Sequence, residues 1–195
     1  AGLKVLLLEE GPLKTSDSFK DMDERRAYRD LYQDGGARAT SDGAIAVMQG
    51  RSVGGSTTVN WTSSFRTPEP TLKFWASECE VVGHGVDEMK PWFEQMEKRL
   101  DVMLWEAHNL NNSVLMRGCE KLGWEAHAIP RNVRGCWNSG YCGLGCPVNA
   151  KQSMLVTTIP STLEKGGELL YLARAERLIY SGDTISSLEC VAMDE

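Results

Sequence analysis

Short apolar runs alternate with polar and glycine-rich stretches along the chain, and the first run predicts a buried strand. Residues 5–8 read Val-Leu-Leu-Leu and are followed at once by Glu9-Glu10-Gly11-Pro12. A continuous apolar run that ends this sharply is typical of a strand covered on both faces in a parallel sheet. The next stretch, 17–33, is charged and lacks a clean period, so we predict a loop there with one helical turn.

Two places carry the pattern of paired strands. Residues 37–40 and 44–49 flank a Ser-Asp-Gly turn, and Asp-Gly favours a tight hairpin. Residues 169–180 and 185–193 flank a Ser-Gly-Asp turn in the same way. We therefore predict a hairpin at each place.

Apolar residues with helical spacing predict three helices later in the chain. In the first, Pro91 falls in the opening turn, where proline is tolerated. The second has Asn112 as its N-terminal cap and ends at Gly123. The predicted helices start near Pro91, Asn112 and Thr157, and the last of them ends at Lys165 before a pair of glycines.

The order of these elements indicates an α/β nucleotide-binding part that is interrupted by a helical insertion. We expect residues 1–70 to form part of the nucleotide-binding domain. Residues 71–150 are expected to form a helical and Cys-rich segment on the substrate side. Residues 151–195 are then expected to return to the nucleotide-binding domain.

Composition narrows the function classes. The 195 residues are 42% apolar and 25% charged, as in an ordinary globular protein, and the net charge is −6. This charge argues against nucleic-acid binding, which needs clustered Lys and Arg. No apolar run approaches the roughly 20 residues that span a bilayer, and no signal-peptide pattern opens the chain. We expect a cytoplasmic protein, with a periplasmic location or membrane association through a partner as the alternatives.

Two motifs carry candidate chemistry. Glu9 stands at the carboxyl end of the first strand, where an acidic residue accepts hydrogen bonds from ribose hydroxyls in dinucleotide-binding sheets. Taken alone, it is more simply explained as a solvated carboxylate at the strand end. The second motif reads Gly-Arg-Ser-Val-Gly-Gly-Ser-Thr-Thr-Val-Asn over 50–60. Gly54 and Gly55 allow the backbone to approach a phosphate, and Arg51 adds positive charge. Asn60 can both donate to and accept from the edge of a heteroaromatic ring.

These motifs resemble the glucose–methanol–choline (GMC) oxidoreductases. Residues 50–68 are similar to the segment that wraps the flavin in that family, and 5–11 to its second strand. The resemblance implies an α/β fold with a Rossmann-like FAD-binding sheet and an inserted helical and irregular segment, here incomplete at both ends. It implies FAD contacts for Glu9 at the ribose, for Ser56, Asn60, Trp61 and Thr62, and for the backbone of Ala175 beside the adenine.

The stretch from Asn60 to Pro68 is one residue longer than the form found in sugar oxidases. It is closer to the branch that resembles long-chain alcohol oxidases and bacterial sugar dehydrogenases. Some family members attach FAD covalently through a His at the Asn60 position, so Asn implies non-covalent binding.

Three of the six Cys residues crowd together as Cys136-x5-Cys142-x3-Cys146. Three thiolates on one loop can bind a soft metal or a cluster. The spacing resembles the loop that holds a three-iron, four-sulfide cluster in some flavin sugar dehydrogenases. A loop of buried thiols, or one disulfide and a free Cys, is the alternative. We expect the other three Cys residues to be small buried apolar residues.

The resemblance implies oxidation of an alcohol CH–OH group with hydride passing to flavin N5. In relatives the catalytic base is a His near the carboxyl end of the full protein, so we assign no catalytic residue here and expect the segment alone to be inactive. The implied partners are a small alcohol and an electron acceptor such as a quinone or a protein. An iron–sulfur or metal-binding electron-transfer module and an NAD-linked Rossmann dehydrogenase are the alternatives.

Overall fold

The computed structural model describes residues 2–194. The chain forms two compact units. Unit 1 comprises Ala1–Trp61 and Ser139–Glu195, and unit 2 comprises Thr62–Asn138. These divisions follow Trp61 and Asn138, whereas the sequence suggested divisions after residues 70 and 150.

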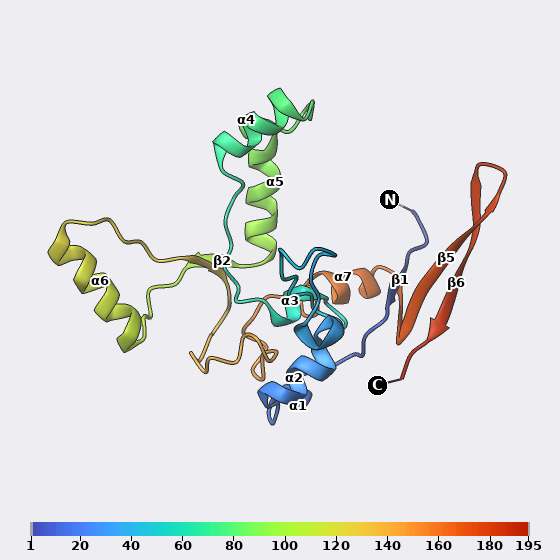
Figure 1. The fold of residues 1–195 in the computed structure, drawn as a ribbon, viewed down its shortest axis with the longest axis horizontal. Helices are drawn as coiled ribbons and strands as arrows, with labels where there is room; N and C mark the ends of the chain where they lie inside the picture. The colour runs from blue at the N-terminus through green and yellow to red at the C-terminus, as the bar shows by residue number, and fades with distance from the viewer. Residues whose placement is uncertain (1, 195) are drawn as a thin grey trace. The chain divides into compact units, whose positions relative to one another are not determined.

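A parallel strand pair in unit 1 carries the end of the first predicted strand. Strand β1 (Leu6–Glu9) pairs with β4 (Glu168–Tyr171), with Leu6 opposite Glu168 and Glu9 opposite Tyr171 (Figure 1). The predicted parallel strand is therefore confirmed, but its predicted burial is wrong, because Leu6 and Leu7 are 56% and 39% exposed. This pair is all of a parallel sheet that residues 2–194 contain, so the Rossmann arrangement itself stays a prediction.

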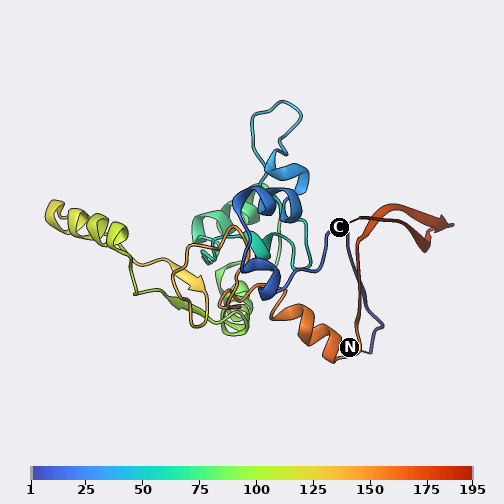
Figure 2. The same ribbon diagram turned by 90° about the horizontal axis from the view of Figure 1, so that it is seen from below.

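A hairpin follows β4 and is formed by β5 (Ala173–Ser181) and β6 (Thr184–Ala192). In both Figure 1 and Figure 2 this hairpin extends away from the N-terminal helices of unit 1. The sequence predicted one strand over 169–180. The structure divides it at Leu172, whose φ of 56° turns the chain out of the strand direction.

The core of unit 1 lies around two helices in a stretch predicted to be a loop with one helical turn. Helix α1 (Ser16–Phe19) is a single turn, whereas the longer α2 (Glu24–Leu31) was not predicted. Asp23 caps α2 by accepting a hydrogen bond from the Arg26 N–H at 2.9 Å. The apolar residues that face inward are few and are separated by charged residues. The helical period is therefore not visible in the sequence. The core cluster consists of Phe19, Met22, Ala27, Leu31, Tyr32 and Val59.

The rest of unit 1 consists of short elements: η1 (Gln33–Gly36), α3 (Ser56–Val59) and α7 (Thr158–Glu164). Helix α7 confirms the predicted short helix. The chain does reverse at the first predicted hairpin, since the Thr40 N–H donates to the Ile45 carbonyl at 2.9 Å. The predicted extent of this hairpin is wrong, because a single bridge between Ala39 and Ala46 replaces the two predicted strands.

Unit 2 contains three helices and one short strand pair. The helices are α4 (Glu69–Glu78), α5 (Val86–Arg99) and α6 (Leu110–Leu122). Strands β2 (Val102–Leu104) and β3 (Pro130–Asn132) pair antiparallel. In both views α6 lies apart from α4 and α5.

Two predictions in this unit need correction, and one helix, α4, was not predicted. Pro91 lies inside α5 and not in its first turn. Helix α6 is capped by Asn109, whose side chain accepts from the Asn112 N–H at 2.8 Å, although it does end at Gly123 with φ 68°. No helix within residues 2–194 has the length and apolar character needed to cross a membrane.

Candidate cofactor site

The end of β1 is held against the glycine-rich segment by close backbone packing. Glu9 Oε1 accepts a hydrogen bond from the Gly11 N–H at 2.7 Å, which turns the chain directly after the strand. A Cβ atom at Gly11 would collide with the carbonyl group of Arg51 and lie 2.7 Å from the Ser52 nitrogen. Glycine at position 11 therefore allows the strand end and the 50–60 segment to meet.

The environment of Glu9 changes its acidity. Burial away from water raises the pKa of its carboxyl group above the usual 4.5, and the charge of Glu10 raises it further. The Gly11 N–H and the positive charge of Arg51 act in the opposite direction. Glu9 is thus a carboxylate that ionises less readily than an exposed one and gains from a new hydrogen-bond donor.

The glycine-rich segment folds back on itself. The Gly50 N–H donates to Ser56 Oγ at 2.9 Å, and Thr57 Oγ1 donates to the Gly54 carbonyl at 2.5 Å. Gly54 and Gly55 have φ values of 95° and 56°, which residues with a side chain rarely adopt. The Ser56 hydroxyl thus closes this turn from within.

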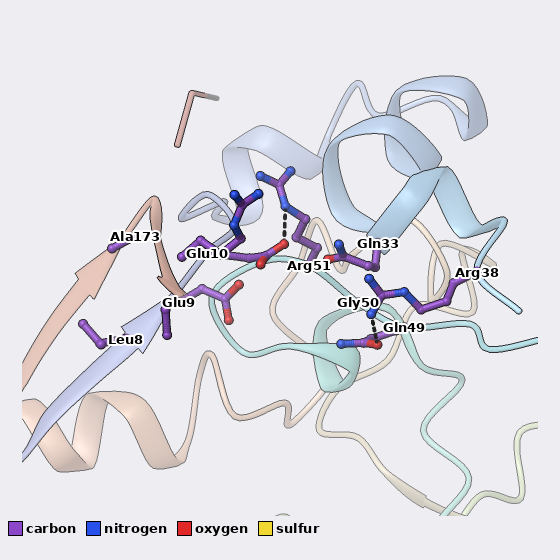
Figure 3. Close-up of a pocket in the computed structure, with 11 residues that line it drawn as sticks. Leu8, Glu9, Glu10, Gln33, Arg38, Gln49, Gly50, Arg51 and Ala173 are labelled. Atoms are coloured by element: carbon purple, nitrogen blue, oxygen red, sulfur yellow. Dashed lines mark hydrogen bonds and ion pairs between the residues drawn. The ribbon is translucent and has the colours of Figure 1, made fainter. Parts of the chain in front are cut away.

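A pocket of about 290 Å³ lies where four segments of unit 1 meet (Figure 3). Figure 3 shows two side-chain pairs on its wall: Arg51 Nε donates to Glu10 Oε1 at 2.9 Å, and Arg38 Nη1 donates to Gln49 Oε1 at 3.1 Å. The lining residues are Leu8, Glu9, Glu10, Gln33, Arg38, Gln49, Gly50, Arg51, Ala173, Arg174 and Ala175.

The residues present fit part of a dinucleotide. The volume is at the lower end of the roughly 300–1,000 Å³ of small-molecule sites, which suits a nucleoside-sized group. A partly buried carboxylate offers an acceptor for hydroxyl groups, and Arg38, Arg51 and Arg174 bring positive charge to the same pocket. The hydroxyl of Ser52, the residue after Arg51, is fully buried without a hydrogen-bond partner among residues 2–194. Such a group costs about 1–3 kcal/mol, so it calls for a partner.

The structure brings some of the predicted site residues together and leaves others apart. Glu9, Arg51 and Ala175 line the pocket, and Gly54, Gly55 and Ser56 form the turn beside it.

Three others have different surroundings. Asn60 is exposed at the end of α3, and Trp61 is 64% exposed. Thr62 is fully buried in unit 2, where its hydroxyl accepts from Arg131 Nε at 2.8 Å. The predicted flavin contacts of these residues stay predictions.

The predicted metal ligands are divided between the units. Cys136 lies in unit 2, whereas Cys142 and Cys146 lie in unit 1. Among residues 2–194 no three His, Cys, Asp or Glu side chains are arranged to hold a metal ion, so the structure does not support the predicted cluster. The expectation that the other Cys residues are buried is wrong: Cys79, at the end of α4, and Cys190 are exposed, and Cys119 is half-buried, since α6 and β6 contain no buried residue.

Sequence reasoning missed several residues of the site. Gln33, Arg38 and Gln49 line the pocket but come from a stretch interpreted as loop and hairpin, where no motif marks them. Arg174 could have been found, because it precedes Ala175 on the predicted strand. Lys151 is 3% exposed and bonds to the end of the glycine-rich segment, yet nothing in its sequence context indicates this.

Comparison with known proteins places these features in a family. A profile of the GMC oxidoreductases matches residues 28–195. Long-chain-alcohol oxidase FAO4B of Arabidopsis thaliana is 35% identical over 190 residues, which cover 97% of this chain and 25% of that protein. Long-chain-alcohol oxidase FAO3 of the same plant is 32% identical over 180 residues, covering 92% of this chain and 24% of that protein.

A bacterial relative gives the same result. An uncharacterized GMC-type oxidoreductase of Mycobacterium tuberculosis is 32% identical over 183 residues, covering 92% of this chain and 29% of that protein. The chain thus spans about a quarter of the length of these curated relatives. The profile match and these identities show that this chain belongs to the GMC oxidoreductase family.

Proposed function

We propose that this chain is the FAD-binding part of an oxidoreductase that oxidises the CH–OH group of an alcohol. The observation that carries the proposal is the pocket in which Glu9, Arg51 and Ala175 meet, although they come from three separate stretches of sequence. Family membership supports a flavin, and relatives named long-chain-alcohol oxidases support an alcohol as the substrate class.

Three residues of the pocket have defined roles in this proposal. The Glu9 carboxylate accepts hydrogen bonds from the ribose hydroxyls, and the backbone of Ala175 flanks the adenine. Arg51, with the N–H groups near Gly54 and Gly55, binds the pyrophosphate. When bound, FAD supplies an acceptor for the hydride of the alcohol.

Glu10 prepares Arg51 for this role. The two side chains are only 20% and 26% exposed, so their ion pair at 2.9 Å is partly shielded from water. Holding the guanidinium in place before the ligand arrives lowers the entropic cost of ordering it. The charge of Glu10 also balances that of Arg51 while no phosphate is present.

The chemical step belongs to residues outside the described pocket. We assign the base that takes the alcohol proton to another part of the full protein, and the electron acceptor to a quinone, a protein or oxygen. Ser56, Asn60, Trp61 and Thr62 are proposed to approach the flavin end of the cofactor.

Cofactor preference of the intact protein tests the proposal. The apoprotein is titrated with FAD, FMN and NAD by calorimetry, because a pocket for the adenosine half predicts tight FAD binding and at least roughly tenfold weaker FMN binding. Anaerobic addition of a long-chain alcohol should then bleach the flavin absorption near 450 nm, a position common to flavins generally. Binding of NAD with no retention of FAD would overturn the proposal in favour of an NAD-linked enzyme.

A further inference from the structure

A buried polar segment, residues 151–153, packs against the glycine-rich segment of unit 1. Lys151 is 3% exposed, Gln152 9% and Ser153 3%, although they lie in an irregular stretch before α7. Lysine is almost never buried to this degree unless its ammonium group is fully bonded. This lysine belongs to no part of the pocket described above, so its burial needs its own explanation.

The ammonium group of Lys151 is bonded to three backbone carbonyls. Nζ donates to the Thr58 carbonyl at 2.8 Å, to the Asn60 carbonyl at 2.7 Å and to the Cys142 carbonyl at 2.6 Å. An ammonium group has three donors, and these bonds match that number. Because the donor is charged, each bond is stronger than one between neutral groups.

These bonds hold the place where the glycine-rich segment ends. Helix α3 ends at Val59, and the last carbonyls of a helix have no partner within it. Lys151 supplies partners for the carbonyls on either side of this end and ties them to the Cys142 loop. A second tie lies close by, since the Met154 N–H donates to Thr57 Oγ1 at 3.0 Å.

We propose that Lys151 is a positioning residue that fixes the backbone of Asn60, and through it the carboxamide side chain, for contact with the flavin. The inference rests on the proposed function, because it assumes that Asn60 approaches FAD. Asn60 is exposed, and its carbonyl accepts a hydrogen bond from the buried Lys151 Nζ at 2.7 Å, which fixes the backbone that carries its carboxamide. Loss of the ammonium group leaves the α3 end without this anchor.

Replacing Lys151 by methionine in the intact protein tests the proposal. Lys151→Met keeps an unbranched side chain but removes the three donors. We expect the FAD dissociation constant, measured by quenching of flavin fluorescence, to rise about tenfold. The visible circular dichroism of the bound flavin should change as well. Lys165→Met, at an exposed lysine of the same unit, is the control and should behave as the wild type.

A double-mutant cycle separates positioning from general stability. If Lys151 acts through Asn60, then Lys151→Met should weaken FAD binding less than about threefold in an Asn60→Ala background. Equal effects of Lys151→Met in both backgrounds would overturn the proposal. A lower melting temperature with unchanged FAD affinity and unchanged flavin circular dichroism would overturn it too.

Two remaining outcomes are also decisive. If Lys151→Met does not fold, Lys151→Gln takes its place in the same cycle, and failure of both to fold assigns Lys151 to folding and overturns the proposal. If the wild-type protein binds no FAD, the proposed function fails, and this result is distinguishable because it does not depend on any variant.

Discussion

At the residue scale, the glycines of the 50–60 segment serve different purposes. A Cβ at Gly54 would lie 2.5 Å from Thr58 Oγ1 and 3.0 Å from Leu155 Cβ. At Gly55 a Cβ would meet nothing within 4 Å. Both have positive φ, so a side chain strains the backbone at either position. Gly54 is therefore needed for packing within the protein, whereas Gly55 leaves open space beside the pocket.

This difference predicts that alanine substitutions at the two glycines differ in their effects on stability and on FAD binding. Gly54→Ala should lower the free energy of unfolding by about 2–4 kcal/mol, because strain and overpacking add. Gly55→Ala should lower it by only about 1–2 kcal/mol from backbone strain, and should weaken FAD binding by filling the open space. Urea unfolding and FAD titration of the two variants provide the measurements. A larger loss of stability in Gly55→Ala would contradict the assignment.

Glu9 predicts a pH effect that differs in sign between binding and stability. Since burial raises its pKa above 4.5, the carboxylate that accepts ribose hydroxyls is lost as the pH falls through that raised value. FAD affinity should therefore decrease as the pH is lowered through this range, which lies above pH 4.5. The same raised pKa means that proton uptake stabilises the fold across this range.

The test uses Glu9→Gln. This variant should bind FAD roughly 10- to 100-fold more weakly near pH 7 and should lose the pH dependence, since a charged hydrogen bond is replaced by a neutral one. Glu164→Gln, at an exposed position of α7, should keep both the affinity and the pH profile of the wild type. An unchanged pH profile in Glu9→Gln would show that another group titrates.

The sequence could identify Glu9, Arg51 and the glycines because their roles depend on local order: a strand end and a turn. It predicted the chain reversal between 37 and 49 but could not show that this reversal brings Arg38 and Gln49 to the pocket, because no local motif marks either residue. Lys151 was equally out of reach, since its partners are backbone carbonyls, which any residue provides.

At the scale of elements, the start of α6 shows which residue acts as the N-terminal cap of a helix. Three asparagines lie near this start, at positions 109, 111 and 112, and the side chain of Asn109 accepts from the Asn112 N–H at 2.8 Å. Asn109 has extended backbone angles, as an N-cap requires, whereas Asn112 lies inside the helix. The sequence predicted the helix and its glycine end but placed the cap one turn too late.

Asn109 and Asn112 provide a matched pair for measurement. Asn109→Ala should destabilise α6 by about 1 kcal/mol, because the first N–H groups lose an acceptor. Asn112→Ala should have no such effect, since alanine favours the helix interior. Hydrogen exchange of the α6 amides in the intact protein measures both. Faster exchange in Asn112→Ala than in Asn109→Ala would contradict the capping geometry.

At the scale of the whole molecule, the buried apolar residues belong mostly to unit 1. Within the described part of unit 2, the buried apolar side chains are Leu72 and Val133, and neither α5 nor α6 has a buried residue. In unit 1, Leu6 and Leu7 of β1 remain 56% and 39% exposed. The parallel pairing of β1 was predictable from its apolar run, but the cover of its faces was not.

These exposed surfaces predict the behaviour of the 195-residue chain expressed by itself. We expect a broad thermal transition without a cooperative calorimetric peak, together with strong binding of the dye ANS, because uncovered apolar surface is typical of loosely packed states. The intact protein is the comparison and should melt sharply. A sharp peak for the isolated chain would show that its two units are sufficient for cooperative folding.

The left-handed backbone at Leu172 links the parallel pair to the pocket. The Leu172 N–H donates to the Gly11 carbonyl at 3.2 Å, and the Leu172 carbonyl accepts from the Met193 N–H at 2.8 Å. One residue thus joins the start of the hairpin, the end of β1 and the last strand. Ala173, Arg174 and Ala175 follow Leu172 directly and line the pocket. The bend at Leu172 therefore sets the direction of this part of the pocket wall. Leucine holds that geometry at an energetic cost, so the site keeps its shape through a conformational strain located outside its own lining.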